Sequence, residues 1–276
     1  MNAPTSELQA YLDVAMNAAF EAAQIHKCHA GGSLEIDTKT TDTDLVTQVD
    51  KASEARIREI ILGAFPDHSI LGEEEGEQGS SATHRWIVDP LDGTLNYAKG
   101  FPIYSVSIGL EVDGILQVGV VIDSARDELF VATKGGGAFF NGRPMRVSNE
   151  ANLKRAMLLT GFHYDPTSAL QNVTLLKNML PRCLAIRRPG SAALDLCYVA
   201  VGRADGFWEL ALKPWDIAAG LLILEEAGGR ITDGFGQPYT WGALSLVVTN
   251  GTLHQTVLDA LEVDSLELHR PAGQPI

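Results

Sequence analysis

The chain has 276 residues, of which 45% are hydrophobic and 20% charged, with a formal net charge of −14 and a pI near 4.8. This length and composition are typical of one large globular domain or of two closely packed halves with ample core. The excess of acidic residues argues against direct binding to nucleic acid or to an anionic lipid surface, because like charges repel at long range.

The three cysteines, Cys28, Cys183 and Cys197, form no short-spaced pair. That pattern is typical of a reduced, cytoplasmic protein. No charged and then apolar leader opens the sequence, and no run reaches about 18 apolar residues. We therefore predict a cytoplasmic protein that is not bound to a membrane.

The first half of the chain is predicted to combine two helices with an antiparallel sheet. Apolar residues at helical spacing predict helices over about 7–30 and 50–65. A loop rich in glycine and glutamate is expected over 71–81. Apolar runs, two of them joined by a hairpin signal, predict strands at 85–88, 105–111, 115–123, 128–133 and 137–141.

In the second half, predicted strands and helices alternate, which is typical of α/β structure. Strands are expected at 157–160, 185–187, 206–210, 230–232 and 246–248. Helices are expected at 168–180, 191–201, 215–227 and 252–261. The change of rhythm near 147–154 predicts an N-terminal α+β subdomain over 1–148 and a C-terminal α/β subdomain over 149–276.

The most informative motif is an apolar strand, Trp86–Val88, that runs into Asp89 and Asp92 and then into Gly93-Thr94 at a predicted helix start. Carboxylate oxygens are the ligands that hard cations prefer, and amides at a helix N-terminus bind anions. The motif thus predicts a place where metal ions and a phosphate meet. In the alternative interpretation, Asp92 only caps the helix and Asp89 only ends the strand.

The spacing of the two aspartates bears on the mechanism. Phosphatases that attack with an aspartate carry Asp-x-Asp-Gly-Thr, in which the carboxylates share one face of an extended chain. Asp89 and Asp92 are three residues apart and do not fit that pattern. We therefore favour attack by a metal-activated water, with the Thr94 hydroxyl orienting the water and Asp50 as the partner of Thr94.

Two further acidic positions are candidates. Glu73 lies in the acidic cluster Gly72–Gly76. This cluster is either a solvated loop or a set of carboxylates whose mutual repulsion a bound cation would reduce. Asp216 follows Lys213-Pro214 and either serves a helix start or binds a metal from a rigid element. The scattered histidines argue against zinc, and the carboxylates favour Mg²⁺, with Mn²⁺ as the alternative.

A second candidate phosphate cradle is Gly190-Ser191-Ala192, at the start of a predicted helix. The alternative interpretation is an ordinary glycine turn with a serine cap. No Gly-Lys-Ser/Thr sequence is present, so neither this cradle nor Gly93-Thr94 is a nucleotide-binding P-loop.

Taken together, four stretches resemble the inositol monophosphatase family, within the lithium-sensitive metal-dependent phosphatase superfamily. They are residues 44–50, 71–74, 86–96 and 206–229. The run 187–196 is similar to bacterial members in particular, and the resemblance covers about 39–229. It implies a layered α/β/α/β/α sandwich, a homodimer and lithium sensitivity.

The resemblance also implies a role for each matching residue. The first Mg²⁺ would be held by Glu73, Asp89 and the Leu91 carbonyl, and the second by Asp89, Asp92 and Asp216. Glu73 would also share a weaker third ion and count as catalytic. Asp50 and Thr94 would position the water, and Gly93 and Thr94 would contact phosphate. The substrate pocket would be lined by Gly190, Ser191, Ala192, Glu209 and Asp216. Leu95 departs from the second threonine of many members, which affects substrate details rather than the metal ligands.

These observations predict Mg²⁺-dependent hydrolysis of myo-inositol monophosphate. Alternative substrates are fructose 1,6-bisphosphate, histidinol phosphate or a 3′-phosphonucleotide. Glu209 favours a neutral polyol, because a carboxylate would repel a second phosphate. A third hypothesis is that the protein is a regulatory partner of the transcription machinery, in which the acidic surface docks a basic protein.

Overall fold

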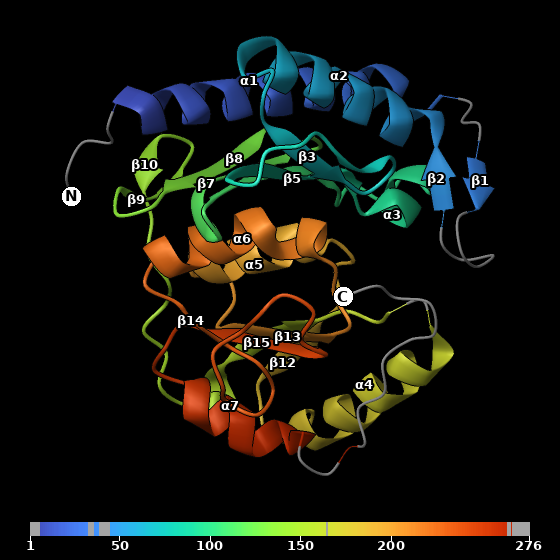
Figure 1. Ribbon diagram of the computed structural model, residues 1–276. Coiled ribbons are helices and arrows are strands. Elements are labelled where there is room, and N and C mark those ends of the chain that lie inside the picture. Colours follow the sequence, from blue (N-terminus) through green and yellow to red (C-terminus); the bar gives the residue numbers. More distant parts are fainter. Residues whose placement is uncertain (1–5, 33–35, 39–44, 164, 264–265, 267–276) are drawn as a thin grey trace.

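The computed structural model describes residues 6–32, 36–38, 45–163, 165–263 and 266. Five layers are visible in Figure 1. The helices α1 (Ser6–His29) and α2 (Gln48–Ala64) cover the outer face of an eight-stranded sheet. Below that sheet lie α5 (Ala192–Ala200) and α6 (Pro214–Glu226), then a five-stranded sheet, and finally α4 (Pro166–Met179) and α7 (His254–Leu261). The predicted α/β/α/β/α sandwich is confirmed.

The eight-stranded sheet has the strand order β10-β9-β8-β7-β6-β5-β3-β4 and is antiparallel except where β3 runs parallel to β5. Its strands are β3 (Ser69–Gly72), β4 (Gly76–Gln78), β5 (His84–Asp92), β6 (Ser105–Val112), β7 (Ile115–Asp123), β8 (Glu128–Thr133), β9 (Gly137–Phe140) and β10 (Arg143–Pro144).

The loop predicted over 71–81 is wrong in part, because β3 and β4 form a hairpin there. Its strands are short, and the residues of β4 are not buried, so the segment lacks the apolar alternation that marks a strand in sequence. The pair β1 (Ile36–Thr38) and β2 (Leu45–Thr47) was missed for the same reason of length. Residues 39–44, where the family resemblance begins, lie outside the described residues.

The five-stranded sheet has the order β12-β11-β13-β15-β14. Its strands are β11 (Met157–Thr160), β12 (Ala185–Arg187), β13 (Gly206–Leu210), β14 (Arg230–Thr232) and β15 (Ser245–Thr249). β11 pairs in parallel with β12 and β13, as the predicted alternation of strands and helices requires. The subdomain boundary near 147–154 stays a prediction.

The helices α5 and α6 join the two sheets into one core. A single cluster of buried residues includes Phe130 from the first sheet, Phe207 from the second and Ala219 from α6. At Gly119 of β7, an added Cβ would lie 2.6 Å from the Ala219 carbonyl oxygen, so only glycine allows α6 this close to the sheet. α6 also contacts β5 and β6 of this sheet.

The opposite face of the eight-stranded sheet packs against α1. The buried side of this helix is rich in alanine, which lets its backbone approach the strands closely. No described helix is long and apolar enough to cross a membrane. Cys28, Cys183 and Cys197 are all free thiols.

Candidate active site

The two aspartates of the central motif lie at a bulge in β5. Asp89 pairs with Ser107 of β6, whereas Asp92 pairs with Ser105, so β5 contains one residue more than its partner between these positions. Ser105 and Ser107 are two residues apart on a strand and therefore share a face, and so do the aspartates opposite them. The spacing argument, which assumed a regular strand, is wrong on this point.

The shared face is the one that α6 covers. Ser107 Oγ donates a hydrogen bond of 3.4 Å to the Trp215 carbonyl oxygen, next to Asp216. Asp89 itself is 2% exposed, and its Oδ1 accepts the Leu91 N–H at 3.0 Å. This bond ties the Asp89 carboxylate to the turn that leads to Asp92.

Asp92 is buried and held by the start of α5. Its carboxylate accepts a short hydrogen bond from Ser191 Oγ, one of 3.3 Å from Ser105 Oγ, and the backbone N–H groups of Ala192 at 3.2 Å and Ala193 at 2.9 Å. Burial raises the pKa of Asp92 to about 6, against the opposite effect of the hydrogen bonds from Ser191 and Ala193.

The second predicted phosphate cradle is therefore occupied from within the chain. The amides at the N-terminus of α5 bind the Asp92 carboxylate. In this structure the segment Gly190–Ala192 orients a candidate metal ligand. Its predicted contact with substrate stays a prediction.

Asp216 and Glu73 approach the same region from two other elements. Asp216 is the third residue of α6, and its Oδ2 accepts the Lys213 N–H at 2.7 Å, so it stabilises the helix start. Burial raises the pKa of Asp216 well above its usual range, and the negative charges of Glu73 and Asp92 add to this effect. Glu73 lies in the turn between β3 and β4, and its N–H donates to the Val88 carbonyl at 3.2 Å.

Asp50 and Thr94 form a hydrogen bond across 44 residues of sequence, because Thr94 Oγ1 lies 2.9 Å from Asp50 Oδ1. The other oxygen, Oδ2, accepts the Thr47 backbone N–H at 2.8 Å and the Thr47 hydroxyl at 2.6 Å in the capping box of α2. Thr94 Oγ1 is also 3.0 Å from the Leu91 carbonyl, but a carboxylate is the stronger acceptor for its single proton.

Gly93 and Gly190 bring the two predicted phosphate-contacting segments together. Gly93 has a φ of +94°, and an added Cβ would lie 2.9 Å from the Ile103 carbonyl and 3.2 Å from the Gly190 carbonyl. Asn96, in the short helix α3 (Thr94–Ala98), donates from Nδ2 to the carbonyls of Ile103 and Pro189, each at 2.9 Å. These contacts fix the turn after Asp92 against the turn before α5.

Glu209 lies on β13 with 9% of its surface exposed. Its carboxyl group fills the space above Gly161, where an added Cβ would be 2.0 Å from Glu209 Oε2. Burial raises the pKa of Glu209 to about 8, although the positive charge of Arg188 acts in the opposite direction. Burial therefore favours the neutral form of this carboxyl. The raised pKa weakens the repulsion argument, and the preference for a neutral polyol stays a prediction.

His26 supports the central motif, although the scattered histidines gave no sign of it in the sequence. It is fully buried on α1, and its Nε2 donates to the Pro90 carbonyl at 2.9 Å, since that oxygen can only accept. Nδ1 then accepts from Ser124 Oγ at 2.9 Å. Burial lowers the pKa of His26 to about 4, so the ring is neutral.

Asp195 is a second buried group that sequence reasoning missed. It lies on α5 with 1% of its surface exposed, and its Oδ1 has no hydrogen-bond partner among the described residues. Burial raises its pKa well above the usual range, and the charges of Glu209 and Asp92 add to this effect. Asp195 thus belongs to the same acidic region.

The donor set fits a hard cation. All candidate ligand side chains are carboxylates, which Mg²⁺ and Mn²⁺ prefer over the nitrogen and sulfur ligands of zinc. In the described part of the chain, no three or more His, Cys, Asp or Glu side chains are grouped closely enough to hold a metal ion. An open arrangement is compatible with Mg²⁺, which commonly takes one or two carboxylates and completes its shell with water and substrate oxygens.

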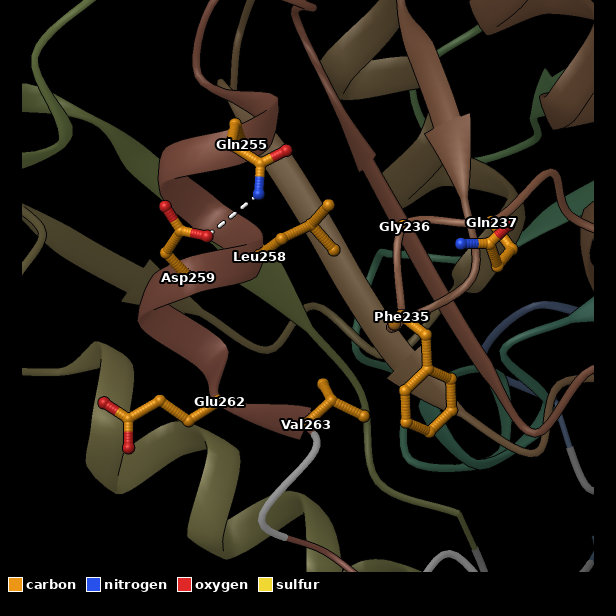
Figure 2. A pocket seen from close by; sticks show the side chains of 9 residues that line it. Phe235, Gly236, Gln237, Gln255, Leu258, Asp259, Glu262 and Val263 are labelled. Atoms are coloured by element: carbon orange, nitrogen blue, oxygen red, sulfur yellow. Dashed lines mark hydrogen bonds between the residues drawn. The ribbon is translucent and has the colours of Figure 1, made fainter.

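A cavity of about 640 Å³ lies elsewhere, between α7 and the turn after β14 (Figure 2). Phe235, Leu258 and Val263 contribute its apolar lining, and Gln255 is hydrogen-bonded to Asp259 at 2.9 Å. None of the predicted site residues lines this cavity. It is therefore separate from the acidic region at the end of β5.

The chain is similar to known proteins over most of its length. A model of the inositol monophosphatase family matches residues 7–265. A relative from Pasteurella multocida, named Nus factor SuhB, is 45% identical over 80% of this chain and 84% of its own. A fructose-1,6-bisphosphatase/inositol-1-monophosphatase from Aquifex aeolicus is 42% identical over 91% of this chain and 95% of its own. The solved structure of inositol monophosphatase from Anabaena superposes with a TM-score of 0.85 at 41% identity, covering 93% of this chain and 96% of that one.

Proposed function

Because this chain belongs to the inositol monophosphatase family and is a phosphatase, we propose that it hydrolyses myo-inositol monophosphate in a Mg²⁺-dependent reaction. The observation that most strongly supports this function is the hydrogen bond between Thr94 and Asp50, beside the carboxylates of Asp89 and Asp92. A hydroxyl and a carboxylate in contact form a unit that can orient and deprotonate a water.

The chemistry of Thr94 and Asp50 follows from the single proton of the Thr94 hydroxyl. When Thr94 donates to Asp50, the Thr94 oxygen is left to accept a hydrogen bond from the attacking water. As the water oxygen bonds to phosphorus, its proton moves to Thr94 and the Thr94 proton moves to Asp50. The bond from phosphorus to the ester oxygen breaks, and that oxygen takes up a proton from solvent. Thr47 keeps Asp50 oriented throughout.

The metal ligands in this proposal are those that the family resemblance implies. Glu73, Asp89 and the Leu91 carbonyl would hold one Mg²⁺, Asp89, Asp92 and Asp216 a second, and Glu73 a weaker third. When bound, these ions would lower the pKa of the nucleophilic water and neutralise negative charge on the phosphate. Mn²⁺ as a substitute and inhibition by lithium are part of the same proposal.

A bisphosphate is the second candidate substrate. Burial raises the pKa of Glu209, which reduces its repulsion of a second phosphate, and Arg188 places a positive charge near Glu209. The Aquifex aeolicus relative is named for fructose-1,6-bisphosphatase as well as inositol-1-monophosphatase activity. A preference for fructose 1,6-bisphosphate over inositol monophosphate would reverse our ranking of the two.

Phosphate release from a panel of esters, with and without Mg²⁺, tests the proposal. We expect turnover of inositol 1-phosphate that requires Mg²⁺ and falls at least 10²-fold in Asp89→Asn, which removes one charged ligand. The matched control is Asp13→Asn, an exposed aspartate on α1, which should behave as the wild type. Near-normal turnover in Asp89→Asn would refute the assigned metal site.

A regulatory role in transcription is a further candidate, since the Pasteurella multocida relative is named Nus factor SuhB. The two roles separate in a deletion strain of the host. If Asp89→Asn restores growth as well as the wild type does, binding to a partner rather than catalysis is the essential activity.

The predicted homodimer is also part of this proposal. Leu170, Leu180 and Leu184 expose 69%, 62% and 67% of their surface. They lie on α4 and on the segment that leads into β12, which is the edge strand of its sheet. Exposed apolar side chains beside an edge strand are typical of a surface that a second copy covers.

A further inference from the structure

A buried ion pair on α2 lies beneath the turn that carries Glu73. Glu54 follows Asp50 by one helical turn and is completely buried. Its carboxylate accepts the backbone N–H of Glu74 at 2.8 Å and that of Glu75 at 3.1 Å. The carboxylate therefore binds the two amides that directly follow the candidate metal ligand.

Arg58, one turn further along α2, completes this clamp. Its Nε donates to Glu54 Oε1 at 2.9 Å, and its Nη2 donates to the Gly76 carbonyl at 2.8 Å. The Arg58 side chain is 7% exposed and that of Glu54 is 0% exposed, so both charges are removed from water. The two side chains grip the turn at its middle and at its end.

Gly72 shows how tightly the turn and the clamp fit. An added Cβ at Gly72 would lie 2.3 Å from Glu54 Oε1 and 2.5 Å from the Glu54 carboxyl carbon. Only a residue without a side chain allows the carboxylate to reach the amides beyond it. The residue type that position 72 tolerates therefore depends on Glu54. Gly72 directly precedes Glu73, so the clamp contacts the chain on both sides of this candidate ligand.

From these contacts we propose that Glu54, paired with Arg58, is a positioning residue that holds Glu73 in the conformation that binds the metal. The inference rests on the proposed function, in which Glu73 is a ligand. A buried ion pair contributes little net stability compared with apolar packing, so stability alone does not account for it. Residues that orient metal ligands typically change metal affinity by about 10- to 100-fold when they are replaced.

The test is Glu54→Gln, which keeps the size of the side chain but leaves one oxygen to accept two amides. It also removes the buried counter-charge of Arg58, which among the described residues then pairs only with the half-exposed Glu75 at 3.5 Å. The matched control is Glu59→Gln on the exposed side of the same helix, where Glu59 pairs with Arg56. We expect the Kd for Mg²⁺ alone, measured by calorimetry, to rise about 10- to 100-fold in Glu54→Gln and less than twofold in Glu59→Gln. At saturating Mg²⁺, kcat should stay within about threefold of wild type, because Glu54 touches no reacting atom.

A folded Glu54→Gln protein with the Mg²⁺ affinity of the wild type would overturn the inference. If this variant does not fold, Arg58→Lys serves instead, because it keeps the charge but cannot donate to Glu54 and Gly76 in the same geometry. The same rise in Kd is expected, and its absence counts against the inference.

The variant Gly72→Ala tests independently whether position 72 and Glu54 act together on Mg²⁺ binding. It should weaken Mg²⁺ binding in the wild-type background and have a smaller effect in the Glu54→Ala background. A wild-type protein that binds Mg²⁺ without hydrolysing any ester would refute the proposed function but still allow this test. A wild-type protein that binds no Mg²⁺ would refute both.

Discussion

Three buried polar residues show how the candidate site is held at the scale of single side chains. Asp50, Asp92 and His26 each expose at most 8% of their surface. Each forms at least two hydrogen bonds that fix its orientation. A buried polar group is tolerated when its partners are satisfied, and it then becomes rigid. Two consequences can be measured.

Thr94→Val keeps the volume of the side chain and removes the hydroxyl between Asp50 and the proposed water. We expect kcat to fall about 10²-fold or more, in the range of lost acid–base catalysis, with KM changed by only a few-fold. Thr94→Ser restores the hydroxyl and should retain at least about a tenth of wild-type kcat. Equal loss in both variants would show that the methyl group, not the hydroxyl, matters.

His26 makes stability depend on pH. Its pKa is lowered from 6.5 to about 4 in the folded state, so the unfolded state binds more protons between these values. The stabilisation from keeping the ring neutral is complete above pH 6.5 and is lost as the pH falls toward 4. We expect His26 to account for about 2 kcal/mol of the difference in unfolding free energy between pH 7 and pH 5.

Urea denaturation at the two pH values checks this prediction. His26→Gln should flatten the pH dependence by that amount, whatever its effect on stability at pH 7. His29→Gln, at an exposed position of the same helix, should keep the wild-type dependence. An unchanged pH dependence in His26→Gln would contradict the assignment of His26.

At the scale of secondary-structure elements, two helix starts and a β-bulge position the carboxylates of the candidate site. The third residues of α2 and α6 are Asp50 and Asp216, and each accepts the backbone N–H of the residue before its helix. The same carboxylate thus stabilises a helix start and faces the candidate site. For Asp216, the interpretation as a helix cap and the interpretation as a ligand are compatible.

Packing of α6 on β7 is predicted to be sensitive to a single methyl group. Gly119→Ala would place a Cβ 2.6 Å from the Ala219 carbonyl, and the resulting shift should cost about 1–3 kcal/mol of unfolding free energy. Gly63→Ala on α2 is the control, because no atom lies within 4 Å of its added Cβ. There the same change should stabilise the protein by about 0.5–1 kcal/mol, since alanine favours the helix. Equal effects from both changes would contradict the close packing.

At the scale of the whole molecule, the two sheets share one core through α5 and α6, and the candidate site lies where these layers meet. Asp92 and Asp216 come from opposite sides of that junction, since one ends a strand of the upper sheet and the other begins a helix below it (Figure 1). Relative movement of the layers would separate them. The site therefore depends on the integrity of the shared core.

The proposed homodimer is tested by light scattering after size exclusion. We expect a particle of twice 29.7 kDa and a shift toward monomer in the double variant Leu180→Glu/Leu184→Glu. Ile115→Glu, at an exposed hairpin tip with 53% of its surface accessible, is the control and should stay dimeric. A wild-type protein that elutes as a monomer would refute the proposal.

Local sequence determined most elements of this protein. Apolar periodicity, caps and turn residues act between near neighbours, so the boundaries of β11, β12, β13 and β14 could be predicted without error. The family stretches likewise contained the candidate metal ligands as well as Asp50 and Thr94. The hairpin of β3 and β4 was missed because its backbone pairing, rather than an apolar pattern, defines it.

Only the tertiary structure decided how the site is assembled. The bulge that puts Asp89 and Asp92 on one face depends on pairing with β6. The amides that bind Asp92 come from 100 and 101 residues away. The raised pKa of Glu209 depends on burial that no neighbour in sequence supplies. Strand register, burial and local charge are set by contacts between distant segments, and these exist only once the layers have packed.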